Sequence, residues 1–147
     1  MPIPTREQLL RWAEGYVALW NSADKEGWAR NWRSVAPGEF RMLDPVGTPE
    51  KFGFEHCCLA SFDLFQPRVK FQIAKGTLFV CGSEVAWVME NHTTVNDRTV
   101  VALSIETYRF DADGSVAIRT YYQVPTHSDP VFGAMFQTYL PDNQEGA

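Results

Sequence analysis

The sequence predicts an α+β domain in which helices come first and a run of antiparallel strands follows. Apolar residues recur with helical spacing in the first part of the chain, and from Gln66 onward apolar and polar residues alternate with a period of two. No linker, repeat or low-complexity segment interrupts the 147 residues. We therefore expect one domain over residues 1–147, with three N-terminal helices packed on a curved antiparallel sheet that encloses a pocket.

The first helix is predicted by its capping residues and its apolar face. Thr5 can cap the helix, and Gln8 has the position of the second residue of a capping box. The segment from Asn21 to Asp24 ends the helix. Apolar residues share one face of it: Leu9, Trp12, Ala13, Tyr16, Leu19 and Trp20.

Two further helices are predicted, with a short strand, EFRML, between them. Asp24 can cap the second helix, and Trp28 and Trp32 are spaced to share its face. The third helix is predicted to start at Thr48-Pro49, because proline is tolerated in a first turn. Its members would include Phe52, His56, Leu59, Ala60 and Leu64.

The strands are indicated by alternation and by turn residues between them. Val69, Phe71 and Ile73 alternate with polar neighbours. Later strands are AWVMENHTTV, RTVVALSIETYRF and SVAIRTYYQV. Bulges or turns are expected at Lys75-Gly76, Cys81-Gly82-Ser83, Asn96-Asp97 and Asp111-Ala112-Asp113-Gly114.

Composition excludes several classes of partner. The net charge of −5 and the absence of a Lys/Arg cluster argue against nucleic acid. The N-terminus lacks signal-peptide features and no apolar run has membrane-spanning length, so we expect a cytoplasmic protein without a membrane partner. Cys57, Cys58 and Cys81 suit reduced thiols, and no metal-ligand spacing is present.

Helices packed on an antiparallel sheet leave a cavity on its concave side, where small molecules commonly bind. Side chains alternate across a strand, so a one-residue slip would reverse every one of them. If Glu106 points into the cavity, then Ala102, Ser104 and Tyr108 do so as well. The strand pattern alone leaves the choice of face open.

Three segments resemble the ketosteroid isomerase and SnoaL-like polyketide cyclase branch of the NTF2-like superfamily: GYVALWNSAD, MLDPVG and ALSIETYRFDADGSVAIRTYY. The resemblance extends from the first helix to Tyr122. It implies that Asp44 is a general base that moves a proton next to a carbonyl, and that Tyr16 is the tyrosine of an oxyanion hole. Glu106 has the position of the family's protonated aspartic acid, a residue kept neutral by an apolar site.

Matching the strands to those of this family places nine residues toward the cavity: Trp87, Met89, Asn91, Thr93, Ala102, Ser104, Tyr108, Arg119 and Tyr121. His56 is a further substrate-binding candidate. The polar members suit a ligand smaller or more polar than a steroid, such as a phenol or an aryl alcohol. An arginine near Glu106 would favour its carboxylate. Arg119, Tyr16 or Tyr121 would then stabilise negative charge, with Asp44 or Glu106 as the base.

Each candidate also has a purely structural interpretation. Asp44 can satisfy backbone amides in a turn before Pro45. Tyr16 can be a core aromatic of an amphipathic helix. Glu106 and Arg119 can form a cross-strand ion pair on the solvated face.

The leading hypothesis is a cofactor-independent acid–base enzyme, a lyase or an isomerase, acting on a small hydrophobic and aromatic substrate. The resemblance includes bacterial lyases that remove formaldehyde from lignin-derived diarylpropanes without a cofactor. The alternatives are a ketosteroid-type isomerase, an epoxide hydrolase or cyclase, and a binding module without catalysis. The fold is also expected to form a homodimer. The apolar segment VFGAMFQTYL suits either the pocket mouth or a partner.

Overall fold

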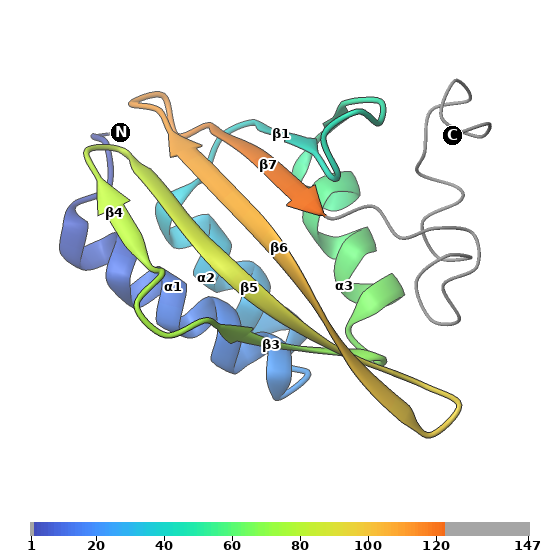
Figure 1. Cartoon of the computed structure of the whole chain (residues 1–147). Helices are drawn as coiled ribbons and strands as arrows, with labels where there is room; N and C mark the ends of the chain where they lie inside the picture. The colour runs from blue at the N-terminus through green and yellow to red at the C-terminus, as the bar shows by residue number, and fades with distance from the viewer. Residues whose placement is uncertain (1, 123–147) are drawn as a thin grey trace.

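A computed structural model describes residues 2–122 of the chain, which form helices followed by a mixed sheet (Figure 1). The segment VFGAMFQTYL lies outside these residues. None of the helices in the described part is long and apolar enough to cross a membrane. The helices are α1 (Arg6–Asn21), α2 (Lys25–Val35), the π-helix η1 (Glu55–Leu59) and α3 (Ala60–Phe65). The strands are β1 (Phe40–Leu43), β2 (Lys51–Phe52), β3 (Val69–Ile73), β4 (Phe79–Cys81), β5 (Glu84–Val95), β6 (Arg98–Phe110) and β7 (Val116–Tyr122).

The first two helices begin at the caps that the sequence predicts. The Thr5 hydroxyl accepts a hydrogen bond from the Gln8 amide at 3.2 Å, and the Gln8 side chain accepts one from the Thr5 amide at 2.8 Å. Asp24 caps α2 by accepting from the Gly27 amide at 2.9 Å. Both helices turn their aromatic faces toward the sheet, which they cover on one side (Figure 1).

The prediction that the third helix starts at Thr48-Pro49 is wrong, because helical structure begins later in the chain. The Thr48 hydroxyl donates to the Pro45 carbonyl at 2.7 Å, and this interaction closes a turn instead of starting a helix. The next residues form β2, where Lys51 pairs with Met42 and Phe52 with Arg41. Helical structure begins only at η1, because pairing with β1 already satisfies the backbone of the preceding residues.

The sheet has the order β2-β1-β7-β6-β5-β3, and β4 also pairs with β5. All pairs are antiparallel except β1 and β7, which run parallel, so the expectation of a purely antiparallel sheet needs this correction. β1 lies between α2 and η1 in the sequence and adds to the sheet beside β7, its last described strand. Figure 1 shows β5 and β6 as a long twisted ribbon that extends beyond the helices.

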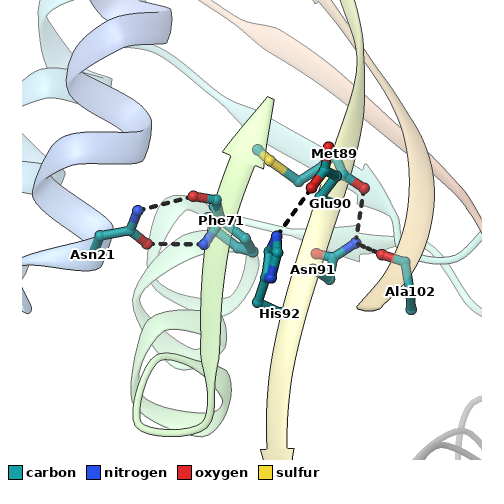
Figure 2. Close-up of polar contacts among 7 residues, drawn as sticks. All are labelled: Asn21, Phe71, Met89, Glu90, Asn91, His92 and Ala102. Carbon is teal, nitrogen blue, oxygen red and sulfur yellow. Dashed lines mark hydrogen bonds and ion pairs between the residues drawn. The ribbon is translucent and has the colours of Figure 1, made fainter. Parts of the chain in front are cut away.

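Aromatic side chains fill the space between the helices and the sheet. Trp12 of α1 stacks on Trp87 of β5, with ring centroids 5.4 Å apart. At the other end of α1, the Asn21 amide donates to the Phe71 carbonyl and accepts from the Phe71 amide, both at 2.9 Å (Figure 2). These contacts fix α1 over β3 and β5, so that the helix forms one wall of a cavity.

Candidate functional site

A cavity of about 100 Å³ lies between the helices and the concave side of the sheet. Its wall is mostly aromatic and apolar, with a few polar side chains among them. The helical side contributes Tyr16, Trp20, Trp28, Trp32, Cys57, Cys58, Ser61 and Phe65. The sheet side and its connections contribute Met42, Asp44, Pro45, Lys51, Val69, Phe71, Asn91, Thr93, Ala102, Glu106, Tyr108, Ile118, Thr120 and Tyr122.

Strand parity places one set of β5 and β6 side chains on the cavity side. Asn91, Ser104, Glu106 and Tyr108 are all buried there. Asn91 donates to Ser104 Oγ at 2.9 Å and to the Ala102 carbonyl at 3.0 Å. Figure 2 shows Asn91 reaching toward Ala102, while the neighbouring His92 contacts Glu90 on the same strand.

Glu106 is the centre of a buried hydrogen-bond network. Its Oε1 accepts from the indole of Trp87 and from the hydroxyl of Tyr108, each at 2.8 Å. Its Oε2 accepts from Ser104 at 2.8 Å. The Glu106 side chain is only 4% exposed. Trp87 and Met89 are buried behind the cavity wall, so Trp87 reaches the site through Glu106.

Burial raises the pKa of Glu106, although the hydrogen bonds from Tyr108, Trp87 and Ser104 lower it in part. The negative charge of Asp44 raises it further. Glu106 is therefore biased toward the neutral acid. A neutral carboxyl group both donates and accepts hydrogen bonds, which a carboxylate cannot do.

Tyr16 joins this network through a hydrogen bond with Tyr108. Burial raises the pKa of the Tyr16 hydroxyl, and the nearby charge of Glu106 raises it further. Tyr16 is therefore a neutral phenol at physiological pH. The tyrosine also lines the cavity directly, next to the Glu106 network.

Asp44 also lines the cavity and lies directly after β1. Its Oδ1 accepts a hydrogen bond from the Thr120 hydroxyl of β7, a partner that the sequence interpretation missed. Burial raises the pKa of Asp44, while the Thr120 hydrogen bond and the positive charge of Lys51 lower it. Asp44 therefore combines the two properties of a general base: partial access to the cavity and a raised pKa.

Arg119 and Tyr121 lie on the outer face of β7, and the expectation that they face the cavity is wrong. A four-residue turn over 111–114 would pair Phe110 with Ser115 and Glu106 with Arg119. The observed register instead pairs Phe110 with Val116 and Glu106 with Thr120. The difference of one residue turns Thr120 inward and leaves Arg119 and Tyr121 exposed.

His56 is exposed on η1 and does not line the cavity, so its expected position is also wrong. The shifted start of the helical segment instead buries Cys57 and Cys58, which line the cavity. Burial raises the pKa of Cys57 to about 11, and burial also raises the pKa of Cys58. Both thiols are therefore protonated and unreactive at neutral pH.

Three cavity-lining residues carry buried polar atoms that have no hydrogen-bond partner. They are the indole nitrogens of Trp28 and Trp32 and the hydroxyl of Thr93. Buried polar groups are normally paired, so such atoms in a cavity wall are candidates for contact with a ligand. Trp12 also has an unpartnered indole nitrogen, but it does not line the cavity. Among residues 2–122, no group of His, Cys, Asp and Glu is arranged to hold a metal ion.

No protein-family model matches this sequence, and no curated protein matches it. Solved structures do match. Rv0760c from Mycobacterium tuberculosis is 20% identical, with a TM-score of 0.62, and the match covers 82% of this chain and 95% of that one. A computationally designed 17-OHP binder is 19% identical, with a TM-score of 0.59 and coverage of 80% and 92%.

A third structure is an NTF2-like protein of unknown function from Cytophaga hutchinsonii. It is 15% identical, with a TM-score of 0.53, and the match covers 84% of this chain and 93% of that one. The helices and the curved sheet that does not close on itself agree with these solved structures. The chain therefore has the NTF2-like fold, an α+β cone.

Proposed function

We propose that this protein is a cofactor-independent acid–base enzyme, an isomerase or a lyase, that acts on a small aromatic substrate. One observation carries the proposal: two carboxyl groups with different surroundings lie in the wall of one cavity. Asp44 is partly accessible and accepts a hydrogen bond from Thr120, whereas Glu106 is buried and accepts three. Different surroundings give two carboxyl groups different roles in proton transfer.

In the proposed mechanism, Asp44 removes a proton from the substrate and Tyr16 hydrogen-bonds the oxygen on which negative charge develops. Tyr108 connects Tyr16 to Glu106. When Glu106 is neutral, its proton can be donated to Tyr108, and the Tyr108 proton can then point to Tyr16. This orientation leaves the Tyr16 proton for the substrate oxygen, which is the arrangement that stabilises an enolate or phenolate.

Arg119 has no part in this mechanism, because it lies on the other face of the sheet. Without an arginine beside it, the neutral form of Glu106 is favoured by burial. The hydrolase alternative relied on an Asp-Arg-Asp type network that included Arg119, and no arginine lines the described cavity. We therefore do not propose an epoxide hydrolase or cyclase.

The size and lining of the cavity support a substrate with one aromatic ring at the reacting end. A volume of about 100 Å³ is below the roughly 300–1,000 Å³ of common ligand pockets. Tryptophan, tyrosine and phenylalanine side chains form much of the wall. The indole nitrogens of Trp28 and Trp32 can donate to hydroxyl or ether oxygens of such a ring.

The proposal is tested by proton exchange into acetophenone, a one-ring ketone, followed in D₂O by NMR. The wild-type protein should exchange the methyl protons faster than buffer does. Asp44→Asn should lower that rate by about 10²- to 10⁴-fold, the usual contribution of a general base. Arg119→Ala, the matched change on the outer face, should stay within about twofold because Arg119 does not reach the cavity.

An unchanged rate in Asp44→Asn would contradict the assignment of the base. The two reaction types are then separated by product. An isomerase moves the double bond of an enone, which changes its ultraviolet absorption, whereas a lyase releases an aldehyde from an aryl alcohol.

A binding module without catalysis is the second candidate. The designed 17-OHP binder shares this fold, so the architecture can hold a ligand without an evolved reaction. In that case acetophenone would bind to the wild-type protein and to Asp44→Asn with similar affinity, and neither protein would exchange its protons above the rate in buffer.

We further propose that the outer face of β6 and β7 pairs two copies of the chain. Val101, Leu103, Ile105 and Tyr121 expose between 41% and 56% of their surface on this face. Apolar side chains gathered on one face commonly mark an interface between proteins. The cavity opens on the opposite face of the sheet, so a homodimer formed in this way would leave each site accessible.

A further inference from the structure

The position of Lys51 is fixed by strand pairing next to the proposed base. β2 pairs with β1 so that Lys51 lies opposite Met42, and directly paired residues turn their side chains to the same face. Met42 is buried in the cavity wall, and Lys51 lines the same cavity. The next pair along, Phe52 with Arg41, is exposed on the other face. Lys51 therefore faces the cavity from β2, which pairs with the strand that leads to Asp44.

Lys51 is the single basic side chain among the described residues that line this cavity. Its charge acts on the cavity wall, since it lowers the pKa of both Asp44 and Cys57. The hydrogen-bonding groups around Glu106 come instead from β5 and β6. The cavity thus has a cationic side formed by β2 and a neutral hydrogen-bonding side formed by the central strands.

We propose that Lys51 binds a carboxylate group of the substrate, which makes the substrate an aromatic carboxylate with a carbonyl or hydroxyl oxygen elsewhere on its ring. The assignment of the reacting end to Tyr16 and Asp44 rests on the proposed function. A monoanion suits the site better than a phosphate, because the carboxylate of Asp44 in the same wall would repel a dianion more strongly. An ammonium group in an aromatic wall is also less screened than one in water.

The test compares two probes of nearly equal shape, 4-acetylbenzoate and 4-acetylbenzamide, which differ in charge. Binding can be followed by intrinsic fluorescence, because Trp20, Trp28 and Trp32 line the cavity. The wild-type protein should bind the carboxylate at least tenfold more tightly than the amide. Lys51→Met should remove this preference and leave the affinity for the amide within about twofold.

Lys70→Met is the matched control. Lys70 is exposed on β3, and its replacement changes the net charge by the same amount without touching the cavity. This variant should keep the full preference for the carboxylate. If Lys51→Met does not fold, Lys51→Gln provides the same loss of charge, and circular dichroism checks both variants.

Three results would overturn the proposal. The wild-type protein could bind both probes equally, bind neither, or keep its preference for the carboxylate after Lys51→Met. If Lys51 is only a structural counterion of Asp44, the wild-type protein should bind both probes equally, and the Lys51→Met variant should be less stable than the wild type. Asp44→Asn separates the two proposals: it should lower the rate of proton exchange into 4-acetylbenzoate by about 10²- to 10⁴-fold, while the preference for binding the carboxylate persists. Exchange that survives in Asp44→Asn would contradict the proposed function alone.

Discussion

The two faces of β6 differ in what their side chains do, although they alternate along one strand. On the cavity face, Ser104 and Tyr108 are buried and hydrogen-bonded to Glu106. On the outer face, Leu103 and Ile105 are exposed by 56% and 51%. On the cavity face, the β6 side chains stabilise the fold through hydrogen bonds to Glu106. On the outer face, they present apolar surface to solvent. Substitutions one residue apart should affect different properties of the protein.

The largest effect on stability is expected from Glu106→Ala. It removes the acceptor of Trp87, Tyr108 and Ser104 and leaves three buried donors unpaired, which should lower the free energy of unfolding by about 3 kcal/mol or more. Ile105→Ala on the outer face should change it by no more than about 0.5 kcal/mol in the monomer. Urea unfolding measures both, and equal losses would mean that the network does not stabilise the fold.

The next effect concerns association. Ile105→Glu places a charge in the middle of the exposed apolar face and should weaken a homodimer at least tenfold, about 1.4 kcal/mol. Sedimentation equilibrium measures the dissociation constant. Thr120→Val replaces a buried side chain on the cavity face with one of similar size, so it should leave the dissociation constant unaltered. A wild-type protein that stays monomeric at high concentration would refute the proposed interface.

A smaller effect is expected from the unpartnered indoles. Trp28→Phe and Trp32→Phe keep an aromatic ring and remove only the N–H donor, so each should weaken binding of an oxygen-substituted ring by about 1 kcal/mol, roughly fivefold. Trp12→Phe is the control, because its buried indole also lacks a partner but does not line the cavity. Calorimetric titration with vanillin would test this. Equal effects in all three variants would show that the loss comes from packing.

The smallest effect is a dependence of stability on pH. Burial raises the folded-state pKa of Glu106 above its ordinary value of 4.5, so the native protein holds this proton at a pH where the unfolded chain has released it. The resulting stabilisation is complete below about pH 4.5 and is lost as the pH rises through the raised pKa. Glu106→Gln should reduce this decline in urea midpoints. An identical slope in the variant would contradict the raised pKa.

Local features of the fold were predictable from the sequence. The capping box of Thr5 and Gln8 fixes the start of α1 within a few residues, and the Asn96-Asp97 turn joins β5 to β6 as a two-residue hairpin. Each of these features depends on neighbours a few positions away. Asp44, Tyr16 and Glu106 were selected from the family resemblance, and the structure brings all three to one cavity.

Features that depend on distant partners were not predictable in the same way. The pairing of β1 with β7 joins segments separated by about half of the chain, and no local pattern encodes its parallel direction. The inward face of β7 depends on one residue in the preceding turn, which decides between Arg119 and Thr120. The signal that was missed is the length of the turn between β6 and β7. When this turn has an odd number of residues, Ile118 and Thr120 lie on the same face of the sheet as Glu106.

The hydrogen bond between Thr120 and Asp44 has a consequence for the order in which parts of the protein fold. The two residues are 76 positions apart, and the carboxyl group is held only when the strand containing Thr120 is in place. Contacts between such distant residues form late, since closing the long intervening loop costs entropy. During synthesis or refolding, we expect the helices and the central hairpin to form before the base is positioned, so that activity is the last property to be acquired.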